Sequence, residues 1–185
     1  MTDQPTVGIY TLGCKVNQYE SEAIAERFAA RGFSVLPHTA VCDVYVINTC
    51  TVTAESDRKS KQFIRRAITR NPKAYILVTG CLSQTAPETV AAIEGVDYVC
   101  GNTEKLSVVE AAEHLLATKK KATPSVLAVS SMENAPFESM SITSFDRTRA
   151  YVKLRTAVNP TAPTVLSPAP VAVSAQSLLT RFWRR

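Results

Sequence analysis

Residues 44–53 read Val-Tyr-Val-Ile-Asn-Thr-Cys-Thr-Val-Thr, and the pattern of this segment recurs along the chain. An apolar run rich in β-branched residues, which is typical of a strand, ends abruptly in a polar loop that carries Cys50. The arrangement occurs twice more, because Val7–Leu12 leads into Gly13-Cys14 and Tyr75–Thr79 leads into Gly80-Cys81. The carboxyl ends of parallel strands lie along one edge of a sheet, so we expect the three thiols to converge.

Strands alternate with helices through the first two thirds of the chain. Strands are predicted at 6–12, 33–36, 44–48, 74–79 and 96–100, and helices at 17–32, 53–71, 87–93 and 106–117. Asn17 is expected to cap the first helix, with Glu20 reaching back to its backbone N–H. The alternation predicts an α/β fold: a doubly wound, flavodoxin-like parallel sheet of about five strands, with helices on both faces and an irregular tail behind it.

Composition narrows the class of protein. The 185 residues are 45% hydrophobic and 20% charged, as in an ordinary globular chain, and the net charge of +5 favours anionic partners such as RNA. We find neither a signal peptide nor an apolar run long enough to span a bilayer, so we expect a cytoplasmic protein without a membrane partner. Five cysteines, an odd number, argue against a disulfide framework and for reduced thiols.

The last third of the chain loses this pattern. We predict a first domain over residues 1–120, a polar linker over 121–147 and a third segment over 148–185. The third segment opens with a short strand-like piece, Ala150–Leu154. From Arg155 onward the sequence has no acidic residue and four prolines between 160 and 170, a composition that opposes regular structure.

The three strand-end cysteines suggest a metal centre. Three thiolates on separate loops can hold three irons of a four-iron cluster and leave the fourth iron open to another ligand. Gly13 and Gly80 would let the backbone approach such a cluster closely, and the helices after Cys14 and Cys50 would add positive potential. The alternative is that these are ordinary buried cysteines, but their matched placement at three strand ends favours metal ligation.

The sequences around the three cysteines also resemble those of a known protein family. Gly-Cys-Lys-Val-Asn-Gln-Tyr-Glu-Ser-Glu at 13–22, Asn-Thr-Cys-Thr-Val-Thr at 48–53 and Val-Thr-Gly-Cys at 78–81 closely resemble the amino-terminal domain of radical-SAM methylthiotransferases. The resemblance runs from Val7 to about Lys105. Within the family, the strings around Cys14 and Cys50 are most similar to the branch that modifies threonylcarbamoyl-adenosine in tRNA.

The resemblance implies that Cys14, Cys50 and Cys81 ligate an auxiliary [4Fe-4S] cluster that delivers sulfur. Cys42 and Cys100 match no family ligand, and we interpret both as core thiols. His38 and His114 are interpreted as surface or loop residues. The basic residues between 58 and 70 are interpreted as a solvated helix face in preference to a tRNA contact.

The sequence departs from the family in its second half. There the family carries a C-x-x-x-C-x-x-C loop for a second [4Fe-4S] cluster, which cleaves S-adenosylmethionine, whereas no cysteine follows Cys100 in this chain. In a shifted reading frame, each codon consists of the last base of one codon and the first two bases of the next. From about Arg155, codons formed in this way can encode Asp-Gly-Cys-x-x-Tyr-Cys-Thr-Tyr-Cys. We therefore hypothesise that the tail is an out-of-frame product of a longer methylthiotransferase gene; a genuine low-complexity tail is the alternative.

The resemblance implies a tRNA methylthiotransferase that inserts and methylates sulfur on carbon two of threonylcarbamoyl-adenosine next to the anticodon. Its partners would be tRNA, bound through other domains, and a sulfur donor. This chain would keep the sulfur-delivery domain, hold no catalytic residue and be inactive alone. The alternatives are the isopentenyl-adenosine tRNA branch, the ribosomal-protein branch, and a non-catalytic iron–sulfur or nucleotide-binding α/β module. The sequence leaves the oligomeric state open.

Overall fold

A single parallel sheet organises the computed structural model, which describes residues 4–51, 53–119, 126–130 and 140. Its six strands lie in the order β2-β1-β3-β4-β5-β6, and every neighbouring pair is parallel. The strands are β1 (Thr6–Thr11), β2 (Ser34–Pro37), β3 (Val44–Thr49), β4 (Tyr75–Gly80), β5 (Tyr98–Cys100) and β6 (Val126–Ala128). The predicted α/β fold is confirmed, with one strand more than expected.

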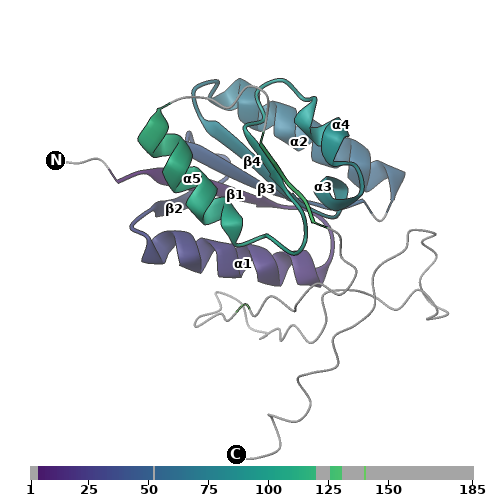
Figure 1. Cartoon of the computed structure of the whole chain (residues 1–185), viewed down its shortest axis with the longest axis horizontal. Coiled ribbons are helices and arrows are strands. Elements are labelled where there is room, and N and C mark those ends of the chain that lie inside the picture. Colours follow the sequence, from purple (N-terminus) through teal and green to yellow (C-terminus); the bar gives the residue numbers. More distant parts are fainter. Residues whose placement is uncertain (1–3, 52, 120–125, 131–139, 141–185) are drawn as a thin grey trace, which may run out of the picture.

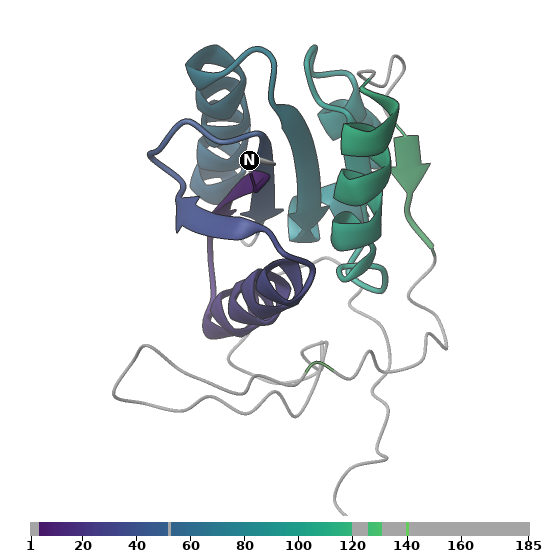
Figure 2. The same cartoon turned by 90° about the vertical axis from the view of Figure 1, so that its left-hand side faces the viewer.

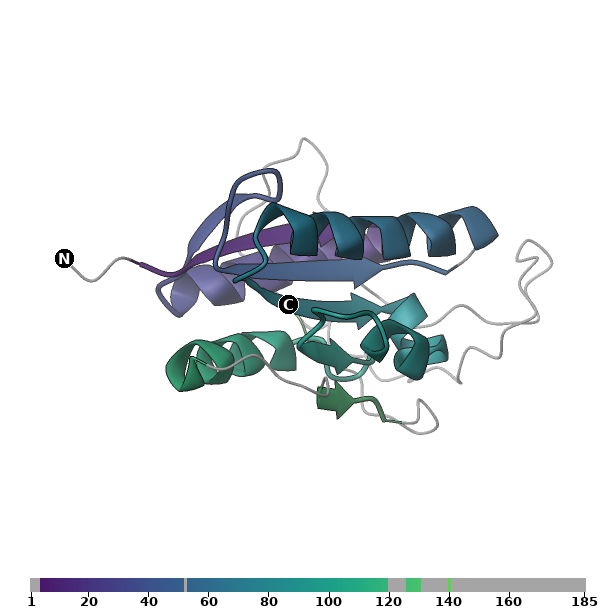
Figure 3. The same ribbon diagram turned by 90° about the horizontal axis from the view of Figure 1, so that it is seen from above.

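Helices cover both faces of the sheet, as the alternating pattern predicts. They are α1 (Lys15–Ala30), α2 (Ala54–Arg70), α3 (Cys81–Thr85), α4 (Pro87–Ala91) and α5 (Ser107–Thr118). α1 and α5 pack on one face, and α2 and α4 pack on the other (Figure 1). Seen from above, α2 and α5 lie on opposite sides of the sheet (Figure 3). The central strands β3 and β4 are buried along their whole length because both of their faces are covered.

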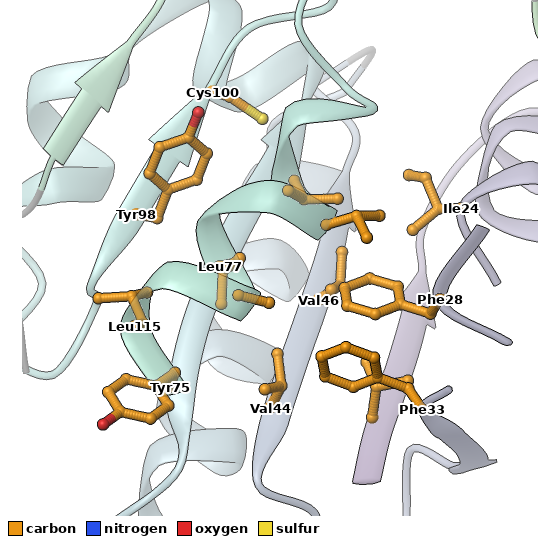
Figure 4. Packing of buried hydrophobic residues seen from close by; sticks show 14 residues of the cluster. Ile24, Phe28, Phe33, Val44, Val46, Tyr75, Leu77, Tyr98, Cys100 and Leu115 are labelled. Carbon is orange, nitrogen blue, oxygen red and sulfur yellow. The ribbon is translucent and has the colours of Figure 1, made fainter. Parts of the chain in front are cut away.

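Two apolar clusters, one on each face, hold these layers together. The cluster under α1 and α5 contains Ile24, Phe28, Val46, Leu77 and Leu115, which point toward one another between the helices and the strands (Figure 4). The cluster under α2 and α4 is built in the same way from the alternate residues of β3 and β4. The strand period of two therefore sends successive side chains into different clusters.

The start of α1 differs from the prediction. The helix begins at Lys15, with Cys14 at the N-cap position, so the assignment of Asn17 as the cap is wrong. Asn17 is buried in the first turn, where its amide bonds to two loops, and Glu20 is paired with Lys105 in the loop between β5 and α5. For α2 the predicted start is confirmed, because the Thr53 hydroxyl accepts a hydrogen bond from the backbone N–H of Ser56 (3.1 Å).

The stretch predicted to be a linker contributes a strand. β6 pairs in parallel with β5 and lies at the outer edge of the sheet (Figure 2). Val126, Leu127 and Ala128 form a short apolar run, and pairing it with β5 satisfies backbone groups that β5 would otherwise expose. Short α3, which follows β4 without a loop, is likewise absent from the prediction.

Two predictions fall outside the described residues: the strand-like piece at 150–154 and the irregular tail from 155. Among the described residues, none of the helices combines the length and apolar character that crossing a bilayer requires.

Candidate metal centre

The strand order fixes where a ligand is expected. β1 and β3 are neighbours, but α1 leaves β1 on one face and α2 leaves β3 on the other. Sheets of this kind bind ligands at the carboxyl ends of the strands where the chain direction switches in this way. Cys14 directly precedes α1, and Cys50 directly follows β3. Cys81, the first residue of α3, follows β4 at the same edge.

The three thiols are exposed to different extents. Cys14 is exposed, Cys81 is half-buried and Cys50 is buried. Gly13, at φ +95°, brings the first loop onto Cys50: a Cβ placed on Gly13 would lie 2.6 Å from the Cys50 Sγ. The loop after β1 can therefore contact Cys50 only because residue 13 has no side chain.

The electrostatics of Cys81 indicate that the three thiols lie near one another. Burial is the largest cause that raises the pKa of the Cys81 thiol, and the positive charge of Lys105 opposes it. Negative charge on Cys50, Cys14 and Glu20 raises the pKa of Cys81 further. Charges affect a thiol in this way only from its vicinity, so Cys14 and Cys50 lie in the vicinity of Cys81.

The thiols do not meet at a single point. Within the residues that the structure describes, no three His, Cys, Asp or Glu side chains are grouped closely enough to hold one metal ion. The donor set nevertheless fits an iron–sulfur cluster, because each cysteine of such a cluster binds a different iron. The buried hydroxyls of Ser83 and Thr103 have no hydrogen-bond partner among the described residues, which leaves donors at the same edge for the sulfur atoms of a bound group.

Two buried asparagines tie the cysteine-bearing loops together. The Asn17 side-chain amide donates to the carbonyl oxygens of Leu12 (2.8 Å) and Thr49 (2.9 Å), which lie just before Cys14 and Cys50. The Asn48 amide donates to the carbonyl oxygen of Asn17 (3.0 Å) and to the Ser21 hydroxyl (3.1 Å). The positions of the first two cysteines are thereby coupled through the start of α1.

The buried hydroxyl of Ser60 also fixes the backbone of Cys50. Ser60, buried in α2, accepts a hydrogen bond from the Cys50 N–H (3.4 Å) and donates to the Cys50 carbonyl (3.1 Å). Gly80, at φ +101°, lets the end of β4 approach β3, since a Cβ there would lie 2.4 Å from the Thr49 carbonyl oxygen. The glycines expected to admit a cluster thus have an observed role in bringing the loops themselves together.

A buried ion pair joins α1 to the loop between β5 and α5. Lys105, in the loop between β5 and α5, donates to the carboxylate of Glu20 in α1, and neither side chain reaches solvent. Isolated charges at such depth are strongly disfavoured, so each of these groups requires the other. The pair holds the loop after β5 against α1 beside the thiols.

The remaining candidate residues lie elsewhere. Cys42 and Cys100 are buried, one in each apolar cluster, as the interpretation of core thiols requires. His114 is exposed on α5, and half-buried His38 packs edge-on against Tyr10 with ring centroids 4.6 Å apart. Neither histidine belongs to a metal-binding group within the described part of the chain.

Sequence reasoning missed the polar supports of the site. Ser60 and Lys105 received no role, and Asn17 and Glu20 received a local one, because capping rules consider only neighbours in the chain. One signal was available for Asn48: a polar residue directly after an apolar strand run, at the edge where ligands bind.

Comparison with known proteins identifies the family to which the chain is related. Residues 6–101 match the model of the family described as "Uncharacterized protein family UPF0004". The chain is 41% identical over 155 residues to the threonylcarbamoyladenosine tRNA methylthiotransferase MtaB of Bacillus subtilis. Proteins of the same name from Aquifex aeolicus and Thermotoga maritima are 42% identical over 115 residues and 37% identical over 149 residues.

These matches cover much of this chain but a minor part of each relative. They include 83%, 62% and 80% of the present chain, against 34%, 28% and 32% of the three relatives. The chain therefore spans about a third of the length of the proteins that it matches. The resemblance to the amino-terminal domain of methylthiotransferases of the MtaB branch is confirmed.

Proposed function

Since the chain belongs to the family UPF0004, we propose that it is the sulfur-delivery domain of a tRNA methylthiotransferase, with Cys14, Cys50 and Cys81 as ligands of an auxiliary [4Fe-4S] cluster. The observation that carries the proposal is the placement of three thiols after three neighbouring strands at one sheet edge, where the loop of Cys14 packs directly on Cys50. The names of the relatives supply the reaction class.

In this proposal the protein orients the ligands and the cluster supplies the sulfur chemistry. The bound cluster would provide an open iron at which sulfur is held for transfer. Asn17 fixes the loops before Cys14 and Cys50 relative to each other, and Ser60 fixes the Cys50 backbone. The start of α1 directs backbone N–H groups toward the site, which favours the negative charge of the thiolates.

The intact enzyme would modify threonylcarbamoyl-adenosine in tRNA, as the names of the relatives state for those proteins. That reaction also needs S-adenosylmethionine and a second cluster, and the sequence has no cysteine after Cys100 to hold one. We therefore propose that this chain is inactive alone and that the segment from about Arg155 derives from a shifted reading frame. We also propose that the protein acts in the cytoplasm. The isopentenyl-adenosine and ribosomal-protein branches remain the alternatives.

Anaerobic reconstitution with iron and sulfide tests the site. We expect about four irons per chain in the wild-type protein and the loss of most of them in Cys50→Ala. Cys42→Ala is the matched control, because Cys42 is equally buried but lies in an apolar cluster, and it should keep its iron. Iron content and visible absorption give the readout. Equal iron in all three proteins, or none in any of them, would contradict the assignment.

A further inference from the structure

Helix α2 carries a marked excess of basic over acidic side chains. The helix has six basic side chains and two acidic ones, so it contributes four of the five net positive charges. Both acidic residues lie in its first turn and are already paired: Glu55 with Arg58 (2.8 Å) and Lys59 (3.5 Å), and Asp57 with Lys61 (3.5 Å). The positive charge farther along the helix is therefore not neutralised by the helix itself.

The basic side chains line a surface hollow. Its volume is about 660 Å³, and its walls are Arg58, Gln62, Arg65, Arg66, Thr69 and Arg70. Every one of these side chains carries a hydrogen-bond donor, and no acidic group lines the hollow within the described part of the chain. We call Arg58, Arg65, Arg66 and Arg70 the arginine row. Guanidinium groups bind phosphate through paired hydrogen bonds, so this hollow suits a phosphate-bearing partner.

Aromatic side chains adjoin the arginine row. A second hollow, of about 170 Å³, shares Arg66 and Arg70 with the first and includes Tyr10, His38 and Phe63 in its lining. Tyr10 stacks on Phe63 with ring centroids 3.8 Å apart, and the Arg66 guanidinium lies 5.1 Å from the Phe63 ring centroid. A basic groove beside aromatic rings is the combination that binds nucleic-acid strands, through phosphates and base stacking.

The placement of α2 links this surface to the candidate metal centre. The helix begins four residues after Cys50, so Arg58 is the member of the arginine row nearest to the thiol edge. At about 1.5 Å per residue, Arg70 lies roughly 18 Å farther along the axis, which is enough to meet several phosphates of one strand. We infer that the arginine row of α2 is a contact surface for the phosphate backbone of RNA. The inference rests on the proposed function, which supplies RNA as the partner.

This inference revises the interpretation of the basic helix as a solvated face. On an ordinary solvent-exposed helix face, acidic and basic side chains alternate and form ion pairs along the helix. In contrast, Arg65, Arg66 and Arg70 form no ion pair with an acidic group among the described residues. The arginines at the C-terminal end of α1 show the contrast, because Arg27 pairs with Glu110 (2.9 Å) and Arg31, at the C-cap, pairs with Glu113 (2.6 Å).

Fluorescence anisotropy of the full chain with a labelled, unmodified tRNA transcript tests the surface. The variant is Arg65→Gln/Arg66→Gln, and the control is Arg27→Gln/Arg31→Gln, which removes the same charge from the opposite face. At about 0.1 M salt we expect about tenfold weaker binding for the α2 variant and less than about twofold for the control. The slope of log affinity against log salt should fall by about 1–2 in the α2 variant alone.

Two outcomes would overturn the inference. Equal weakening in both double variants would mean that net charge alone attracts the RNA. Unchanged affinity and slope in the α2 variant would mean that the arginine row does not contact the RNA. The iron content of the same preparations keeps the two proposals apart. If the proteins bind about four irons per chain but the two double variants bind RNA equally well, only the RNA surface is rejected. If the α2 variant binds RNA more weakly than the control but no protein binds iron, the RNA surface is supported and the cluster is rejected.

Discussion

The carboxyl edge of the sheet and the apolar clusters on its faces both contain cysteines, but in opposite surroundings. At the edge, Cys14, Cys50 and Cys81 follow strand ends and lie among polar side chains and helix starts. Cys42 lies just before β3 and Cys100 is the last residue of β5, but both side chains are buried and belong to the apolar clusters. Burial raises the pKa of both cluster thiols, as it does for Cys81, and favours their neutral form. The candidate ligands thus differ from the core thiols in side-chain placement: Cys14, Cys50 and Cys81 come after a strand end and belong to neither cluster, whereas Cys42 and Cys100 each belong to one.

The two regions also differ in how they contribute to stability. The clusters bury apolar surface, which favours folding. The edge buries Asn17, Asn48 and the charged pair of Glu20 and Lys105, whose removal from water must be offset by specific partners. A protein selected for stability alone has no need of such an edge, so its polar content fits a site that binds a ligand. Three measurements can break or sharpen this contrast.

The largest effect is expected at the buried ion pair. Glu20→Ala leaves the Lys105 ammonium buried without its carboxylate, and we expect a loss of about 3–5 kcal/mol in the free energy of unfolding, measured in urea. Glu113→Ala is the control: it breaks the exposed pair with Arg31 and should cost at most about 1 kcal/mol.

A double replacement sharpens the same test. Glu20→Leu/Lys105→Met substitutes apolar groups for both charges and should recover most of the stability, since a buried pair gains little over a packed apolar one. The double variant should still bind less iron if the pair holds the loop after β5 beside the thiols. A Glu20→Ala protein as stable as the wild type would show that the pair is not buried in solution.

An intermediate effect is expected at the glycines of the strand ends. Gly80→Ala combines a positive φ with a Cβ 2.4 Å from the Thr49 carbonyl oxygen, so we expect a loss of about 2–4 kcal/mol. Gly32→Ala also has a positive φ, but nothing lies within 4 Å of its Cβ, so about 1 kcal/mol is expected. Thermal unfolding of both variants measures the difference. Equal losses would mean that the close approach of β3 and β4 contributes nothing.

The smallest effect should come from the core thiol and depends on pH. Burial raises the pKa of Cys100 from an ordinary value of 9.0 to about 12. Its contribution to stability is therefore complete below pH 9 and is lost as the pH rises from 9 toward 12. Between pH 8 and pH 11 the wild type should lose about 2–3 kcal/mol more than Cys100→Ala, in which this titration is absent. Parallel urea curves at both pH values decide it, and identical pH dependence would refute the buried, neutral state.

Most of the fold could be predicted because its signals are local. Apolar runs such as 44–49 and 75–80 mark the buried strands, and Thr53 marks the start of α2 within a few residues. The strand β6 was missed because three apolar residues in a polar stretch become a strand only when β5 offers an edge to pair with. Helix α3 was missed because five residues that directly follow a strand carry no helical period of their own.

The parallel α/β sheet and the three cysteines at its carboxyl edge follow from the amino-acid sequence alone, because strand period and strand ends are properties of consecutive residues. The folded chain is needed to show that Asn17 joins two loops, that Glu20 pairs with Lys105, and that Arg66 and Arg70 of α2 adjoin Tyr10 and His38. These contacts join residues separated by 32 to 85 positions or lying on different elements. Chain folding brings them together, and no local pattern records the distance between side chains that are far apart in sequence.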